Sequence, residues 1–189
     1  MRTVAVDGLG ALVDATTFAA LAVGSLGDEV NLEQATPCGE WNIGMLLEHL
    51  GDSVAAIEEG FCIGKVGLAA VPLVDPRPST LALRIERLHL IARHPDNVGR
   101  ETVPIEGAAI VRDHLSAVGA LEIAVHAWDV TTAKVQAPDI PPPLATALMT
   151  TAIAVVARDD RGIRFGPPVP MSRESRVSDR LLAFLGRQP

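Results

Sequence analysis

The sequence predicts an all-α fold, and three observations support this class. Apolar residues recur at helical spacing in successive blocks, Pro- and Gly-rich segments separate these blocks, and almost no stretch alternates as a half-buried strand would. A chain of 189 residues has the size of one ordinary domain. We therefore expect residues 1–189 to form a single helical bundle with one further helical segment at the C-terminus.

The first two predicted helices lie on either side of a turn. The block from Leu9 to about Leu26 is rich in Ala, and its apolar residues follow helical spacing. The segment Asn31–Gly39 contains Pro37, which disfavours regular structure there. Asn42 is a good helix N-cap, and the apolar pattern after it predicts a second helix over Ile43–Phe61.

A loop separates the second helix from the third. The segment Gly64–Pro78 is rich in Pro and Gly, so we expect it to run over the surface. Ser79 or Thr80 can cap the third helix. This helix is expected to run to His94, because Pro95 cannot continue it.

The second half of the chain predicts two more helices and a helical tail. Thr102–Val103 is expected to be a short extended piece, and Gly107–Thr132 is expected to form the fourth and longest helix. A fifth helix is predicted over Leu144–Arg158. After the Pro/Gly-rich segment Asp159–Arg176, the residues Asp179–Leu185 are expected to form a short amphipathic helix.

Composition and charge exclude several classes of function. Because 48% of the residues are hydrophobic but only 3% are aromatic, the core must be aliphatic. The net charge of −7 and the lack of a Lys/Arg-rich segment exclude nucleic acid as the main partner. The apolar stretches Leu9–Leu26 and Ala108–Val130 contain charged residues, so neither is expected to span a membrane. The N-terminus lacks the layout of a signal peptide, and we expect a cytoplasmic protein with Cys38 and Cys62 as free thiols.

The fourth predicted helix carries a carboxylate where its apolar stripe predicts a core residue. Glu122 continues this stripe, and His126 follows four residues later on the same face. A carboxylate taken out of water needs a cation, which here could be a protonated His126, an Arg or a metal ion. The stripe itself consists of Val111, Leu115, Val118 and Val125.

The second predicted helix offers a partner for this pair. His49 flanks its main apolar stripe, on a side where Ser53 and Ala56 are small enough to leave room for a pocket. If the two helices face each other, His49 meets Glu122 and His126, which together form the His2Glu set of catalytic zinc sites. The alternative is a common surface pair of Glu and His on one helix turn, with no metal.

Other titratable residues have simpler explanations from the sequence. His89 and His94 lie near the end of an Arg-containing helix, where histidine is ordinary surface chemistry, and His114 is expected to be solvated. Cys38 precedes the second helix and could be a reactive thiol, but an inert small residue is favoured. Asp129 lies on the same face as the predicted metal ligands, where it could orient one of them or pair with an Arg.

Three stretches of the sequence resemble a known family. Thr36–Asn42 (TPCGEWN), continuing into the second helix, resembles the "T-P-C-x-x-W…L…H" opening of the mycothiol-dependent, DinB-like metal-binding proteins of actinobacteria. Glu122–Val130 (EIAVHAWDV) resembles the "E-x-x-x-H-x-W-D" signature of that family. Asp179–Arg187 (DRLLAFLGR) resembles the "D-R-L-L-x-x-x-G-R" ending of its smaller, single-domain branch.

This resemblance implies a DinB-like four-helix bundle with zinc or nickel bound by His49, Glu122 and His126. It also implies a mycothiol-dependent transferase or isomerase whose partners are a small-molecule thiol and a small electrophile. The maleylpyruvate isomerases of the family carry an additional C-terminal domain with catalytic residues, so we do not expect that reaction here.

Two alternatives stay open at this stage. Because no general acid or base stands out beside the ligands, the chain could be a non-enzymatic metal- or ligand-binding protein of the stress response. Its aliphatic surplus could also cover the face of a homodimer.

Overall fold

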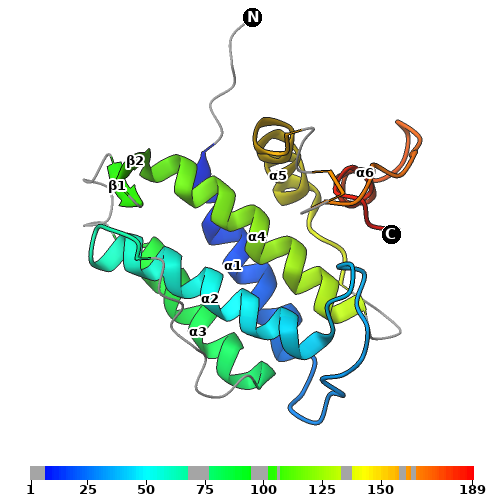
Figure 1. Cartoon of the computed structure of the whole chain (residues 1–189), viewed down its shortest axis with the longest axis horizontal. Helices are drawn as coiled ribbons and strands as arrows, with labels where there is room; N and C mark the ends of the chain where they lie inside the picture. Colours follow the sequence, from blue (N-terminus) through cyan, green and yellow to red (C-terminus); the bar gives the residue numbers. More distant parts are fainter. Residues whose placement is uncertain are drawn as a thin grey trace, which may run out of the picture.

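The computed structural model describes residues 7–67, 77–94, 102–105, 107–132, 138–157, 161–162 and 165–189. Within them the fold is mostly helical, with a two-stranded antiparallel hairpin between the third and fourth helices (Figure 1). The elements in chain order are α1 (Gly8–Gly24), α2 (Ile43–Cys62), α3 (Pro78–Ala92), β1 (Thr102–Ile105), β2 (Ala108–Val111), α4 (Arg112–Thr132), α5 (Pro142–Val155) and α6 (Val177–Phe184).

The first four helices pack as a bundle around an aliphatic core. α1 packs against both α3 and α4, and α2 packs against the same two helices from the other side. α5 and α6 pack on each other, and α5 joins them to α4 (Figure 1). Each fully buried Leu or Ile contributes about 1.5–3 kcal/mol of transfer free energy, so these contacts stabilise the bundle. The largest fully buried side chains include Leu12, Leu46, Leu50, Ile85, Leu88 and Ile123.

The start of α2 agrees with the sequence, whereas the start of α3 does not. The side chain of Asn42 accepts a hydrogen bond of 2.9 Å from the backbone N–H of Met45, which confirms the predicted cap. Neither Ser79 nor Thr80 caps α3, because the helix already begins at Pro78. Pro is favoured at a first helical position, where no N–H is needed. The backbone N–H of Ser79 donates instead to the distant carboxylate of Asp28, at 3.0 Å.

The hairpin corrects the predicted start of the fourth helix. Gly107 and the segment Ala108–Val111 were expected to be helical, but Ala108–Val111 pairs with Thr102–Ile105, and α4 begins only at Arg112. Gly107 has a φ of +84°, a left-handed conformation that suits the tight turn of a hairpin and that glycine adopts at little cost. The extended piece expected at Thr102–Val103 is confirmed as part of β1.

The remaining helix ends differ by a few residues from those expected. α5 begins at Pro142, again with Pro in its first turn, and the expected end at Arg158 lies outside the described residues. α6 covers Val177–Phe184. Most of the predicted loop before α3 and the stop at Pro95 also lie outside the described residues. Among the helices that are described, none is both long and apolar enough to cross a membrane.

Candidate metal centre

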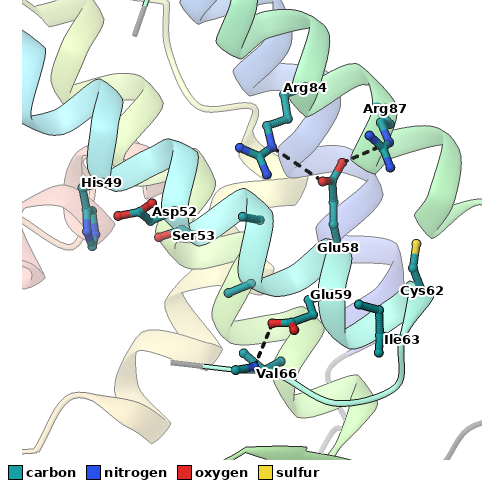
Figure 2. A pocket seen from close by; sticks show the side chains of 13 residues that line it. His49, Asp52, Ser53, Glu58, Glu59, Cys62, Ile63, Val66, Arg84 and Arg87 are labelled. Atoms are coloured by element: carbon teal, nitrogen blue, oxygen red, sulfur yellow. Dashed lines mark hydrogen bonds and ion pairs between the residues drawn. The ribbon is translucent and has the colours of Figure 1, made fainter. Parts of the chain in front are cut away.

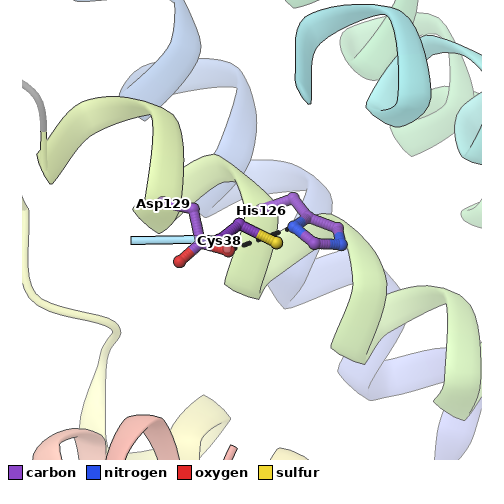
Figure 3. Close-up of side chains that lie close together, drawn as sticks. All are labelled: Cys38, His126 and Asp129. Atoms are coloured by element: carbon purple, nitrogen blue, oxygen red, sulfur yellow. Dashed lines mark hydrogen bonds and ion pairs between the residues drawn. The ribbon is translucent and has the colours of Figure 1, made fainter. Parts of the chain in front are cut away.

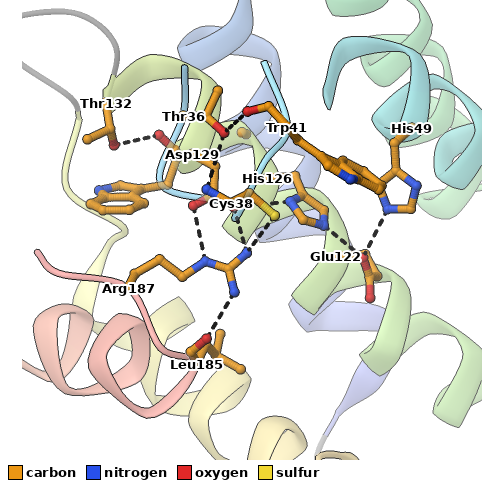
Figure 4. A network of polar contacts seen from close by, with 12 residues as sticks. Thr36, Cys38, Trp41, His49, Glu122, His126, Asp129, Thr132, Leu185 and Arg187 are labelled. Carbon is orange, nitrogen blue, oxygen red and sulfur yellow. Dashed lines mark hydrogen bonds and ion pairs between the residues drawn. The ribbon is translucent and has the colours of Figure 1, made fainter. Parts of the chain in front are cut away.

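The structure brings the three predicted metal ligands together. His49 extends from α2, and Glu122 and His126 extend from α4 toward it (Figure 4). Glu122 Oε2 lies 3.6 Å from His49 Nε2 and 3.2 Å from His126 Nε2. The three ligand atoms all lie within 4.8 Å of one another. The predicted juxtaposition of α2 and α4 is therefore present.

The argument from the apolar stripe was wrong, although it led to these residues. Val111 belongs to β2 and is 56% exposed, and the side chain of Glu122 is 37% exposed. α4 instead turns its small residues inward, which lets neighbouring helices approach closely: a Cβ added at Gly119 would lie 2.5 Å from the Ile57 side chain. A pattern of large apolar residues misses such a face, and its buried positions include Ala117, Ala120, Ala124 and Ala127.

The distances from Glu122 to the two histidines fit a tetrahedral metal ion. Bonds of about 2.0–2.1 Å to His nitrogen and carboxylate oxygen place ligand atoms about 3.3 Å apart in a tetrahedral zinc site. The separations of 3.2 and 3.6 Å that Glu122 makes with the two histidines bracket this distance. Three protein ligands leave a fourth position for water or another small molecule.

Behind this group, a buried ion pair fixes the orientation of His126. The Nδ1 of His126 lies 3.1 Å from a carboxylate oxygen of Asp129, which is fully buried (Figure 3). Arg187 holds the same carboxylate with two hydrogen bonds, from Nη2 at 2.7 Å and from Nε at 3.2 Å. Both roles considered for Asp129 are therefore present, since it orients a predicted ligand and pairs with an Arg. This is the arrangement by which carboxylates fix metal-binding imidazoles, leaving Nε2 free to coordinate.

Sequence reasoning assigned no role to Arg187 in the site. It lies 58 residues after Asp129 in the chain and comes from the turn that follows α6 (Figure 4). Its side chain is only 6% exposed. The only hint in the sequence was that Arg187 is the final residue of the stretch that resembles the ending of the single-domain family branch. Its pairing with Asp129 depends on how α6 folds back over the bundle.

Cys38 contacts the same guanidinium. Its Sγ accepts a hydrogen bond of 3.4 Å from Nη2 of Arg187, and it groups with His126 and Asp129 as a second set of metal-ligating side chains. In this set a cationic group, the guanidinium of Arg187, already lies against both the sulfur and the carboxylate. We therefore regard the set that contains His49 as the better candidate for a metal ion.

The TPCGEWN stretch builds the loop that covers the site. The Thr36 hydroxyl donates a hydrogen bond of 2.7 Å to the backbone oxygen of Trp41 and accepts one of 3.2 Å from the N–H of Cys38. This places the indole of Trp41 edge-on to His49, with 4.8 Å between ring centroids, and stacked on His126 at 6.4 Å (Figure 4). The loop thus restricts both imidazole rings from one side.

Charge couples the members of the site. Burial raises the pKa of Glu122, but hydrogen bonds from His126 and His49 outweigh it and hold the pKa well below its usual range. Burial lowers the pKa of His126, yet hydrogen bonds with Asp129, Cys38 and Glu122 raise it well above its usual range. Without a metal, the site is therefore a network of a charged His126 and ionised carboxylates, and a metal ion must displace the Nε2 proton to bind.

The other histidines lie apart from this group. His89 approaches the hydroxyl of Thr16 at 3.1 Å, between α3 and α1. His94 and His114 are exposed, as expected for surface residues. Cys62, at the far end of α2, is an exposed free cysteine.

Comparisons with known proteins place the chain among mycobacterial relatives. No family model and no solved structure matches it. It is 30% identical over 177 residues to "Uncharacterized protein Rv0738" of Mycobacterium tuberculosis strain ATCC 25618 / H37Rv, across 90% of this chain and 91% of that protein. "Uncharacterized protein MT0763" of strain CDC 1551 / Oshkosh matches with the same identity and coverage. This similarity extends over nearly the full length of both chains, and the protein therefore belongs to the same family as these two mycobacterial proteins.

Proposed function

We propose that the protein binds one divalent metal ion, zinc or nickel, through His49 Nε2, Glu122 Oε2 and His126 Nε2. The observation that carries this proposal is the convergence of three ligand atoms from two helices within 4.8 Å, with the two Glu122–His separations close to those of a tetrahedral site. The carboxylate of Asp129 behind His126 supports it, because a metal-binding imidazole needs a fixed tautomer and orientation.

The proposed activity is thiol-dependent transfer to, or isomerisation of, a small electrophile, with mycothiol as the thiol. A bound divalent ion would acidify a coordinating thiol, so that the thiol releases its proton to water and is a nucleophilic thiolate at neutral pH. Three ligands leave a position for that thiol, and Trp41 shields the two imidazoles on one side. The resemblance of the three sequence stretches to the DinB-like family supports the thiol as partner.

Metal analysis of purified protein tests the first part of the proposal. We expect one zinc or nickel ion per chain in the wild type, and loss of the ion in His49→Ala and His126→Ala. The matched control is His114→Ala, because His114 is exposed and lies outside the group. A folded wild-type protein with no affinity for added zinc or nickel would refute the metal site.

A second experiment tests the thiol. Titrating mycothiol into cobalt-substituted protein should produce a sulfur-to-metal charge-transfer band, and His49→Ala should abolish it. A metal-loaded protein that shows no such band would instead favour a non-enzymatic metal-binding protein of the stress response.

A further inference from the structure

A groove begins at His49 and follows the outward side of α2. It has a volume of about 560 Å³, which is within the range of small-molecule sites. His49, Asp52 and Ser53 lie at one end, and Glu58, Arg84 and Arg87 lie at the other (Figure 2). His49 thus belongs both to the proposed metal site and to the groove.

Two guanidinium groups and two carboxylates line the far end of the groove, those of Arg84, Arg87, Glu58 and Glu59. Two guanidinium groups on α3, those of Arg84 and Arg87, converge on the single carboxylate of Glu58 on α2. The carboxylate is buried, with its side chain only 10% exposed, whereas the side chain of Arg87 is 71% exposed. The other carboxylate at this end, that of Glu59, accepts a hydrogen bond of 2.7 Å from the backbone N–H of Gly67.

The contacts of these arginines leave their outer nitrogens available. Arg84 and Arg87 approach Glu58 through Nε at 3.6 and 3.7 Å, which is longer than a hydrogen bond. Neither arginine forms a side-chain hydrogen bond within the described part of the chain, and each pairs with Glu58 only as an ion pair. A guanidinium presents these atoms as a planar fork that matches the two oxygens of a carboxylate.

We propose that the groove binds an elongated small molecule whose terminal carboxylate is held by Arg84 and Arg87 and whose other end reaches the metal beside His49. This inference rests on the proposed metal site. The separation sets the size of the ligand: Glu58 lies nine positions after His49 on α2, which is about 13.5 Å along the helix at 1.5 Å per residue. Asp52, which lines the groove at the His49 end, favours a hydrogen-bond donor in the part of the ligand near the metal.

A molecular ruler tests this inference on cobalt-substituted protein. The probes are mercaptoundecanoic acid, whose thiol binds the metal and whose carboxylate can reach the arginines, and the matched mercaptoundecanol, which lacks the charge. We expect the acid to bind about tenfold more tightly than the alcohol, since hydrogen bonds to charged groups exceed neutral ones in strength. The short mercaptopropionic acid should show no such advantage over mercaptopropanol.

Variants assign the preference to the arginines. Arg87→Gln should remove most of the higher affinity for the acid while leaving the affinity for the alcohol unchanged. Because the side chain of Arg87 is 71% exposed, we expect this variant to fold. Arg93→Gln, at the exposed C-cap of α3 and outside the groove, is the control and should behave as wild type. Equal affinity for acid and alcohol in the wild type, with normal charge-transfer bands, would overturn the inference.

A metal-independent measurement separates this inference from the proposed function. Undecanoic acid, which has no thiol, should shift the Nε–Hε NMR signals of Arg84 and Arg87 but not that of Arg93. If neither thiol gives a charge-transfer band, the thiol chemistry fails, and the NMR titration decides the carboxylate site. Unchanged signals for both arginines would then overturn it.

Discussion

Replacing Asp129 by Asn is the sharpest test of how the site is supported. Asn has nearly the same shape as Asp but no charge, so the substitution removes a buried carboxylate without leaving a cavity. In the wild type that carboxylate contacts His126 Nδ1 at 3.1 Å and accepts hydrogen bonds of 2.7 and 3.2 Å from Arg187. The variant weakens the support of His126 and leaves the guanidinium of Arg187 without its counter-charge.

The expected magnitudes follow from these contacts. Loss of a carboxylate that orients a metal-binding His lowers metal affinity about 10–100-fold, or about 1.4–2.8 kcal/mol. Leaving one member of a buried ion pair uncompensated costs about 3–5 kcal/mol of folding free energy. The side chain of Arg187 is 6% exposed and that of Asp129 is fully buried, so solvent screens this loss little.

The two effects are measured separately. Competition with a chromophoric chelator gives the zinc dissociation constant, and urea denaturation of the metal-free protein gives the free energy of unfolding. Arg176→Gln is the control, because Arg176 forms a surface ion pair with Asp179 that should contribute little. A folded Asp129→Asn protein whose zinc affinity stays within twofold of the wild type would refute the argument that Asp129 positions His126.

Three further predictions concern pH and packing. In metal-free protein, the raised pKa of His126 stabilises the fold fully below about pH 6.5, and this contribution is lost as the pH rises through the folded-state pKa. The lowered pKa of Glu122 has the opposite effect, because its contribution to stability is present above about pH 4.5 and is lost at lower pH. Urea denaturation should therefore show the largest difference between wild type and His126→Gln between these two values, and a difference that does not change with pH would contradict this. Asn42→Ala should cost about 1 kcal/mol through loss of the α2 cap, measured by thermal unfolding, with unchanged stability as the contrary result. Gly119→Ala should lower the free energy of unfolding by about 1–3 kcal/mol, because the added Cβ would lie 2.5 Å from the Ile57 side chain of α2. Gly24→Ala is the control and should be tolerated, since the nearest atom to its Cβ is 3.7 Å away. Equal stability of the two variants would show that α4 can move away from α2.

Local features of the fold could be predicted from the sequence. The cap at Asn42 and the apolar spacing after it define α2, because helix propensity and capping depend on residues a few positions apart. The hairpin before α4 was not predicted, since its strands are only four residues long and the apolar residues of β2 also fit a helical pattern. Pairing with β1 decided between the two conformations.

The candidate site, too, was predictable only where it depends on residues close together in the sequence. The sequence by itself determined that Glu122 and His126 share one helix face, because residues four apart in a helix always do. Only the tertiary structure decided that His49 completes the group and that Arg187, from the turn after α6, holds Asp129 behind it. These contacts depend on how α2, α4 and the C-terminal segment pack on one another, and the small residues that set the packing of α4 leave little trace in a pattern of large apolar side chains.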